Sequence, residues 1–152
     1  MISPRRDAQH GTTTVEFAII AVVLLTILFA VIEFGRALFT FAVLSEGTRR
    51  AARIATVCPV NSPAIANAAA FATLPGFSTA NVAVSYLNQA GAAVANPAGN
   101  VVAIRYVRVN ITNYSFPLAI PIVAPTITVP AFAVTLPRES LGSNGAGGTL
   151  GC

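Results

Sequence analysis

The sequence has few charged side chains: Asp, Glu, Lys and Arg make up 9% of its 152 residues, whereas a soluble globular domain carries about 25%. It contains no lysine and no tryptophan, and its single histidine (His10) and single aspartate (Asp7) both lie near the N-terminus. Catalysis by proton transfer needs a group that titrates near neutrality, and metal sites use His, Cys and carboxylates. These shortages exclude an ordinary cytosolic enzyme, and we expect no catalytic site, cofactor or metal.

Hydrophobic residues are abundant instead, at 55% of the chain with a mean hydropathy of +0.72. This composition excludes a disordered tail, and the net charge of +4 is too small for a broad nucleic-acid-binding face. Arg105 and Arg108 could form an anion site, but two arginines without aromatic platforms are a weak signal. We interpret them as solvated residues on the outer face of a strand and expect no nucleic-acid partner.

One uncharged run, Phe17–Ile32, is a candidate membrane span. As a helix it extends for roughly 24 Å, which is less than the hydrocarbon core of about 30 Å. A start at Thr12 lengthens the span but places Glu16 in lipid, and an extension at the other end places Glu33 and Arg36 in lipid. Either way an ionisable residue lies at or inside the bilayer edge, where it is a candidate functional residue.

This span is expected to remain in the mature protein. Its apolar run is longer than that of a cleaved secretory signal, and no A-x-A-like site follows it. Two acid–base pairs come next, Glu33–Arg36 and Glu46–Arg50, with helical spacing and the favourable Glu-first order. Stabilisation of a solvated helix is their simplest role. Counting arginines alone would put the C-terminal part in the cytoplasm, but these glutamates interleave with the arginines, so the count does not fix the orientation.

The start of the chain, MISPRRDAQHGTTTVEF, is a short basic leader that ends in Gly11 and leads through Glu16 into the apolar run. It resembles a type IV prepilin, in which a membrane peptidase cuts after the glycine and leaves a glutamate at the fifth mature position. Cleavage would then make Thr12 the N-terminus. A first residue other than Phe, with Glu followed by Phe, is similar to the Tad (Flp) branch.

Glu16 would lie four residues from the new amine at Thr12, on the same helix face. It could neutralise its own amine, pair with the amine of an incoming subunit, or merely complement the dipole of its helix. The three roles stay open at this point.

Two later segments are similar to the same branch. EGTRRAARIATVC resembles the Ala/Arg-rich helix continuation of TadE-like proteins, and NYSFPLAIPIVAPTITVPAFAVTLPRES resembles their proline-rich crossing and terminal strand. The resemblance implies a minor pilin or pseudopilin of a Tad pilus involved in surface adhesion. It implies a single span in the bacterial inner membrane, an extracytoplasmic C-terminal domain, and either a membrane or a filament location. The implied partners are pilin subunits, the assembly machinery, a prepilin peptidase and the lipid bilayer.

Two other functions stay open. A signal-anchored extracytoplasmic binding or regulatory module would keep residues 1–11, so cleavage after Gly11 discriminates against it. A type II secretion pseudopilin is less favoured by Thr12 and by the TadE-like C-terminal region.

The apolar pattern predicts an α+β fold, in which a long pilin-like helix packs against a small antiparallel sheet that cannot bury its face alone. The long helix should run from Val15 to Val57 with Pro59 closing it. A short helix should follow over Ser62–Thr73, with Ser62 as N-cap and Pro63 in the first turn. The predicted strands are Val82–Leu87, Val101–Ile111 and Ile127–Leu136, the last an edge strand or broken at Pro130, with a hairpin loop after the first and a crossover over Tyr114–Pro125.

The expected domains are therefore a cleaved leader (1–11), the long helix with its transmembrane first half (12–57), an α+β head (58–139) and a Gly-rich tail (140–152). We expect the tail to be flexible unless its last residue is tethered. Cys58 ends the long helix and Cys152 ends the tail, and two cysteines in an extracytoplasmic domain fit an oxidising compartment. A Cys58–Cys152 disulfide is predicted, with two unrelated thiols as the alternative.

Overall fold

A single long helix dominates the computed structural model, which describes residues 10–70, 74–118, 126–146 and 148–152. This helix, α1 (His10–Val57), has 48 residues and a length of about 70 Å at 1.5 Å per residue. It begins earlier than the predicted Val15, and it ends at Val57 as predicted because Pro59 cannot continue it. The remainder of the predicted leader, residues 1–9, lies outside the described residues.

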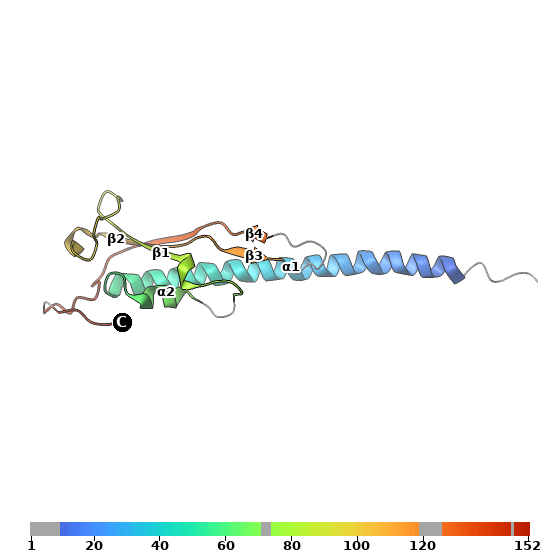
Figure 1. Ribbon diagram of the computed structural model, residues 1–152, viewed down its shortest axis with the longest axis horizontal. Coiled ribbons are helices and arrows are strands. Elements are labelled where there is room, and N and C mark those ends of the chain that lie inside the picture. The colour runs from blue at the N-terminus through green and yellow to red at the C-terminus, as the bar shows by residue number, and fades with distance from the viewer. Residues whose placement is uncertain (1–9, 71–73, 119–125, 147) are drawn as a thin grey trace, which may run out of the picture.

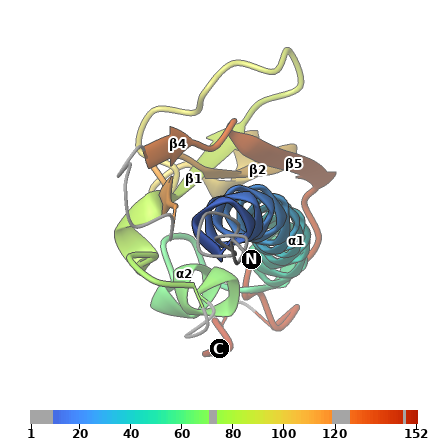
Figure 2. The same cartoon turned by 90° about the vertical axis from the view of Figure 1, so that its right-hand side faces the viewer.

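The two halves of α1 have different surroundings. The half up to Ile32 projects from the rest of the molecule (Figure 1), and the C-terminal half lies between a β-sheet on one side and helix α2 on the other (Figure 2). Ala51, Ala52 and Ala55 are fully buried there. Their small side chains let the sheet and α2 approach the backbone of α1 closely, so one helix serves both as the projecting segment and as the spine of the head.

The main sheet has three antiparallel strands in the order β1-β2-β5, namely β1 (Val82–Leu87), β2 (Tyr106–Ile111) and β5 (Phe132–Pro137). In β2 the residues Val107, Val109 and Ile111 are buried, whereas Arg108 is exposed on the outer face. Alternate burial is the pattern of a strand with one face on a core. The predicted α+β fold, with a long helix and a small antiparallel sheet, is confirmed.

The strand predicted to begin at Val101 begins at Tyr106 instead. Val101–Ala103 forms a short 3-10 turn, and Ile104 packs into the core. The reason lies in the partners: Tyr106 pairs with Leu87 and Pro137, where β1 and β5 end. Residues before Tyr106 therefore have no strand to pair with, whatever their β propensity.

A second, two-stranded sheet joins β3 (Ser115–Pro117) and β4 (Thr126–Thr128). The predicted crossover from Tyr114 to Pro125 thus contains a strand, and its residues 119–125 lie outside the described residues. The predicted strand Ile127–Leu136 is divided into β4 and β5, with the break at Pro130. β5 is also an edge strand, so both expectations for the proline hold.

The short helix α2 (Pro63–Ala69) begins as predicted, because the Ser62 hydroxyl accepts a hydrogen bond from the Ala64 N–H and Pro63 occupies the first turn. It ends before the predicted Thr73. The Ala70 N–H closes its last turn, and residues 71–73 lie outside the described residues. A 3-10 turn, η1 (Thr79–Asn81), leads from this region into β1.

The core consists of two adjoining clusters along α1. The distal cluster lies beneath the main sheet and contains Ala51, Ala52, Ala55, Cys58, Ile65, Ala69, Tyr86, Ile104, Val107, Val109 and Leu141. The proximal cluster, nearer the projecting half of α1, contains Leu44, Leu74, Ile111, Tyr114, Phe116 and Val129. Both clusters include residues of α1, so the head is assembled on the C-terminal half of this helix.

Candidate membrane and assembly surface

The projecting half of α1 exposes nearly all of its large apolar side chains, including Phe17, Ile20 and Phe29. Within the described residues, Gly11–Val57 is the one helix long and apolar enough to cross a membrane, and none of its most apolar stretch is buried. An exposed apolar patch larger than a few hundred Å² marks an interaction surface in a soluble monomer. This half of α1 can therefore span a bilayer.

Gly11, Thr12 and Glu16 lie together in the first turns of α1, and all three are exposed. Space around Gly11 is open, because a Cβ placed on it would meet no other atom within 4 Å. The Glu16 carboxylate makes no ion pair with any residue in the described part of the chain. The predicted processing and assembly residues are thus accessible on one segment.

Glu33 and Arg36 form a salt bridge where the projecting half of α1 meets the head. Arg36 Nη1 donates to Glu33 Oε1 at 2.6 Å, and Glu33 is only 8% exposed. The Arg36 guanidinium also lies 5.1 Å from the ring centroid of Phe116 in β3. The sequence predicts a solvated helix pair here, but Glu33 is buried, and the half-buried Arg36 contacts the small sheet, so the pair also helps to dock β3 on α1.

Glu46 and Arg50 lie one turn apart further along α1, and both are exposed. Their pairing stays a prediction. Arg105 and Arg108 are also exposed, and Arg108 Nε donates to Asn110 Oδ1 at 3.2 Å on the outer face of β2. Arg108 therefore has the position predicted for a solvated arginine on a strand, whereas Arg105 is exposed but lies just before β2.

The predicted disulfide between Cys58 and Cys152 is present, with a Cα–Cα distance of 5.8 Å. It fixes the tail beside the C-terminal end of α1, whose last carbonyls lack partners within the helix. Backbone N–H groups of the tail supply them: Leu141 donates to Thr56 at 3.1 Å and Gly142 to Val57 at 2.6 Å. The tail is therefore tethered, and it caps α1.

Two buried tyrosines hold the turns around α1. The Tyr86 hydroxyl accepts a hydrogen bond from the Asn61 N–H at 2.9 Å, and the Tyr114 hydroxyl donates to the Pro75 carbonyl at 3.2 Å. Burial raises the pKa of Tyr86, and the Asn61 N–H opposes this effect. Burial likewise raises the pKa of Tyr114, and the charge of Arg36 opposes it. Both phenols are therefore neutral at physiological pH and act as structural contacts.

Sequence reasoning singled out candidate residues on α1 itself. It missed the residues of other elements that contact α1. Phe116 and Tyr114 lie far from Arg36 in sequence, so no helical spacing connects them. Gly142 was treated as one glycine of a flexible tail, but its φ of +79° places it in a tight turn, which the glycine-rich sequence around it does not single out. In the ranges that the structure describes, no three His, Cys, Asp or Glu side chains gather in a way that could hold a metal ion.

An exposed apolar helix whose other half packs against a small antiparallel sheet is the arrangement that the resemblance to TadE-like proteins implied. Residues 11–53 match the family model of the TadE-like proteins, so the predicted resemblance is confirmed over this segment. The match begins at Gly11 and ends within α1, so the likeness of the head to the same family stays a prediction. No curated protein and no solved structure matches this chain. The TadE-like family is associated with pili and is generally structural rather than catalytic.

Proposed function

We propose that this protein is a structural subunit, a minor pilin or pseudopilin, of a Tad (Flp) pilus involved in surface adhesion. In this proposal residues 1–11 are a leader removed by a prepilin peptidase, and the first half of α1 inserts in the bacterial inner membrane. The head (58–139) and the tail (140–152) then lie on the extracytoplasmic side. The partners are other pilin subunits, the assembly machinery and the lipid bilayer.

The observation that carries the proposal is the coincidence of two features on one segment. The TadE-like match covers residues 11–53, and the same segment exposes a continuous apolar helix surface. Such a surface is stable in a bilayer, and it also suits packing against other apolar helices once a subunit leaves the lipid.

The proposal assigns Glu16 a role in pairing one subunit with the next. Cleavage after Gly11 creates a cationic amine at Thr12, at the positive end of the helix dipole and near lipid, which is unfavourable on both counts. In the proposed assembly, Glu16 pairs with the amine of an incoming, axially staggered subunit. A carboxylate left without such a partner in lipid is costly, so the pair favours one axial register. The exposed carboxylate of Glu16 leaves room for this contact.

The test compares two isosteric substitutions on the same helix, Glu16→Gln and Glu46→Gln. Both side chains are exposed, but only Glu16 lies in the apolar half. We expect Glu16→Gln to be cleaved and inserted normally and yet to lose co-purification with pilin partners and piliation. Glu46→Gln should behave like the wild type.

Measurements of surface pili and of pull-down yield, in a strain deleted for the native copy, decide the outcome. If the Glu16→Gln protein is cleaved, co-purifies with pilins and supports wild-type piliation, the intersubunit role of Glu16 is wrong. If deletion of the whole gene leaves piliation and adhesion unchanged, the proposed function itself is wrong.

A further inference from the structure

The exposed apolar surface of α1 does not end at Ile32, where the uncharged run of the sequence ends. Phe34, Leu38 and Phe39 are 66%, 53% and 57% exposed, although they flank the start of the head. Large apolar side chains therefore continue about two turns beyond Glu33. A membrane boundary placed at Ile32 would leave these side chains in water.

The salt bridge between Glu33 and Arg36 does not require the membrane boundary to lie before Glu33. Glu33 is buried and bonded to Arg36 at 2.6 Å, and the Arg36 guanidinium is covered on one side by Phe116. A charge is costly near lipid chiefly when it is unpaired and unsolvated. The salt bridge and the aromatic ring reduce that cost, and the aliphatic stem of Arg36 allows its head to reach the polar interface.

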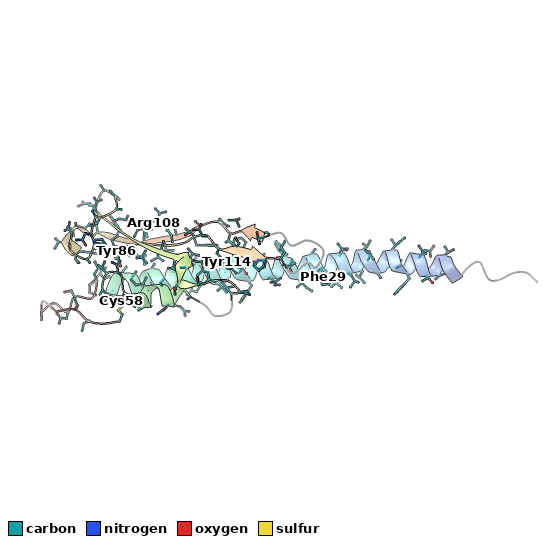
Figure 3. All side chains as sticks on the ribbon, viewed as in Figure 1. Phe29, Cys58, Tyr86, Arg108 and Tyr114 are labelled. Atoms are coloured by element: carbon teal, nitrogen blue, oxygen red, sulfur yellow. A yellow bond between two sulfur atoms is a disulfide. The ribbon has the colours of Figure 1, made fainter. Side chains whose placement is uncertain are left out.

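The small sheet lies at the same height along α1. In Figure 1, β3 and β4 lie at the end of the head that faces the projecting half of α1. Figure 3 labels Phe29 on the projecting side of this end and Tyr114, which directly precedes β3, on the side of the head. Phe116 contacts Arg36 and is the register partner of Ile127 in β4. Ile127 is 46% exposed, and neither β3 nor β4 contains a charged residue.

The distance along α1 fits this level as a membrane boundary. From Glu16 to Arg36 the helix rises about 30 Å at 1.5 Å per residue, which is the thickness of the hydrocarbon core. This register places Glu16 at one interface and the Glu33–Arg36 pair close to the other. It keeps both carboxylates close to the interfaces, where the cost of a charge is lower than at the centre of the bilayer.

We infer that the end of the head formed by Arg36, Phe39 and Ile127, the membrane-facing edge, rests in the interfacial layer of a phospholipid bilayer. The head thus binds the lipid surface directly rather than standing clear of it on the helix. The inference rests on the membrane span of the proposed function, but not on pilus assembly. Its ligand is the lipid surface, which the edge suits because its other side chains are apolar and its one cation, Arg36, is paired with Glu33.

The absence of tryptophan from the sequence allows a test by single-tryptophan fluorescence. The full chain carrying Ile127→Trp is reconstituted at low protein density in phosphatidylcholine vesicles, with or without bromine on the acyl chains. Phe29→Trp, in the middle of the span, is the control for lipid contact. Thr135→Trp, an exposed strand position in β5 on the main sheet, is the control for a solvated head. Circular dichroism and an intact disulfide verify that all three variants fold.

We expect brominated lipid to quench the fluorescence of Phe29→Trp strongly and that of Thr135→Trp hardly at all. The quenching of Ile127→Trp should lie between these two controls. If Ile127→Trp is quenched no more than Thr135→Trp while Phe29→Trp is quenched, the head stands clear of the lipid and the inference is overturned, with the span intact. A blue-shifted Ile127→Trp emission without quenching would show a protein contact instead of lipid and would also overturn it. If Phe29→Trp is not quenched, the span itself is wrong, and the proposed function fails with it.

Discussion

Gly142 is one of the residues through which the C-terminal tail contacts the end of α1. Its φ of +79° lies in the left-handed region, and a Cβ at this position would lie 2.6 Å from Pro59 Cγ. Its N–H donates to the Val57 carbonyl. A residue with a side chain would therefore meet both backbone strain and a clash with a rigid ring, and it would displace the cap of α1.

Replacing Gly142 by alanine should destabilise the head by about 1–3 kcal/mol, the usual range for a strained position. Gly145→Ala is the matched control, because Gly145 has a φ of +74° but open space around its Cβ position. Urea unfolding of the detergent-solubilised protein, followed by circular dichroism, measures both. Equal losses for the two variants would mean that the contact with Pro59 contributes nothing.

Single residues were predictable where their signal is local. Ser62 and Pro63 predicted the start of α2 correctly because an N-cap and a first-turn proline act within a few residues. Gly142 was not predictable in the same way, because its requirement comes from Pro59, which is distant in sequence. The burial of Glu33 likewise depends on a head that helical spacing alone does not place.

At the scale of elements, the apolar run and Pro59 predicted the end of α1 at Val57, although α1 begins at His10 rather than Val15, and Val82–Leu87 was predicted as it is observed. The signals for these elements are local: the hydrophobic periodicity, the residue propensities, and the proline or turn residues that flank them. β2 begins later than predicted because its partners end, and β3 was missed because three residues form a strand only where Phe116 can pack on α1. Strand limits are thus set by neighbours as much as by sequence.

The tail and α1 form one unit through the Cys58–Cys152 bond, which closes a loop with a sequence separation of 94 residues. Loss of a native disulfide from a small secreted domain costs about 2–5 kcal/mol, and a loop near this length lies at the upper end in the chain-entropy model. Cys152→Ser should therefore lower the free energy of unfolding by this amount and release the cap of α1.

The control for this prediction is the double variant Cys58→Ser/Cys152→Ser, whose loss should nearly equal that of the single variant because both remove the same bond. Clearly additive losses would show that the cysteines act separately. Alkylation of the non-reduced protein, purified from its host, offers an independent check. Two free thiols would contradict the bond and would weaken the extracytoplasmic placement of the head.

At the scale of the whole molecule, the two halves of α1 lie in different environments. The C-terminal half is covered by the sheet and α2, and the N-terminal half is left apolar and exposed. A soluble protein would be unstable against aggregation with this surface. The division predicts that the chain needs detergent or lipid to stay dispersed.

N-terminal processing separates a pilus subunit from a signal-anchored module, because only the former loses its leader. Gly11→Ala is the matched control, since an added Cβ meets no atom within 4 Å and the fold should be unchanged. The decisive measurement is the intact mass of the protein purified from a host with an active prepilin peptidase. We predict a wild-type mass for a chain that begins at Thr12 and a full-length mass for Gly11→Ala. Retention of Met1–Gly11 in the wild-type protein would contradict the assignment as a prepilin.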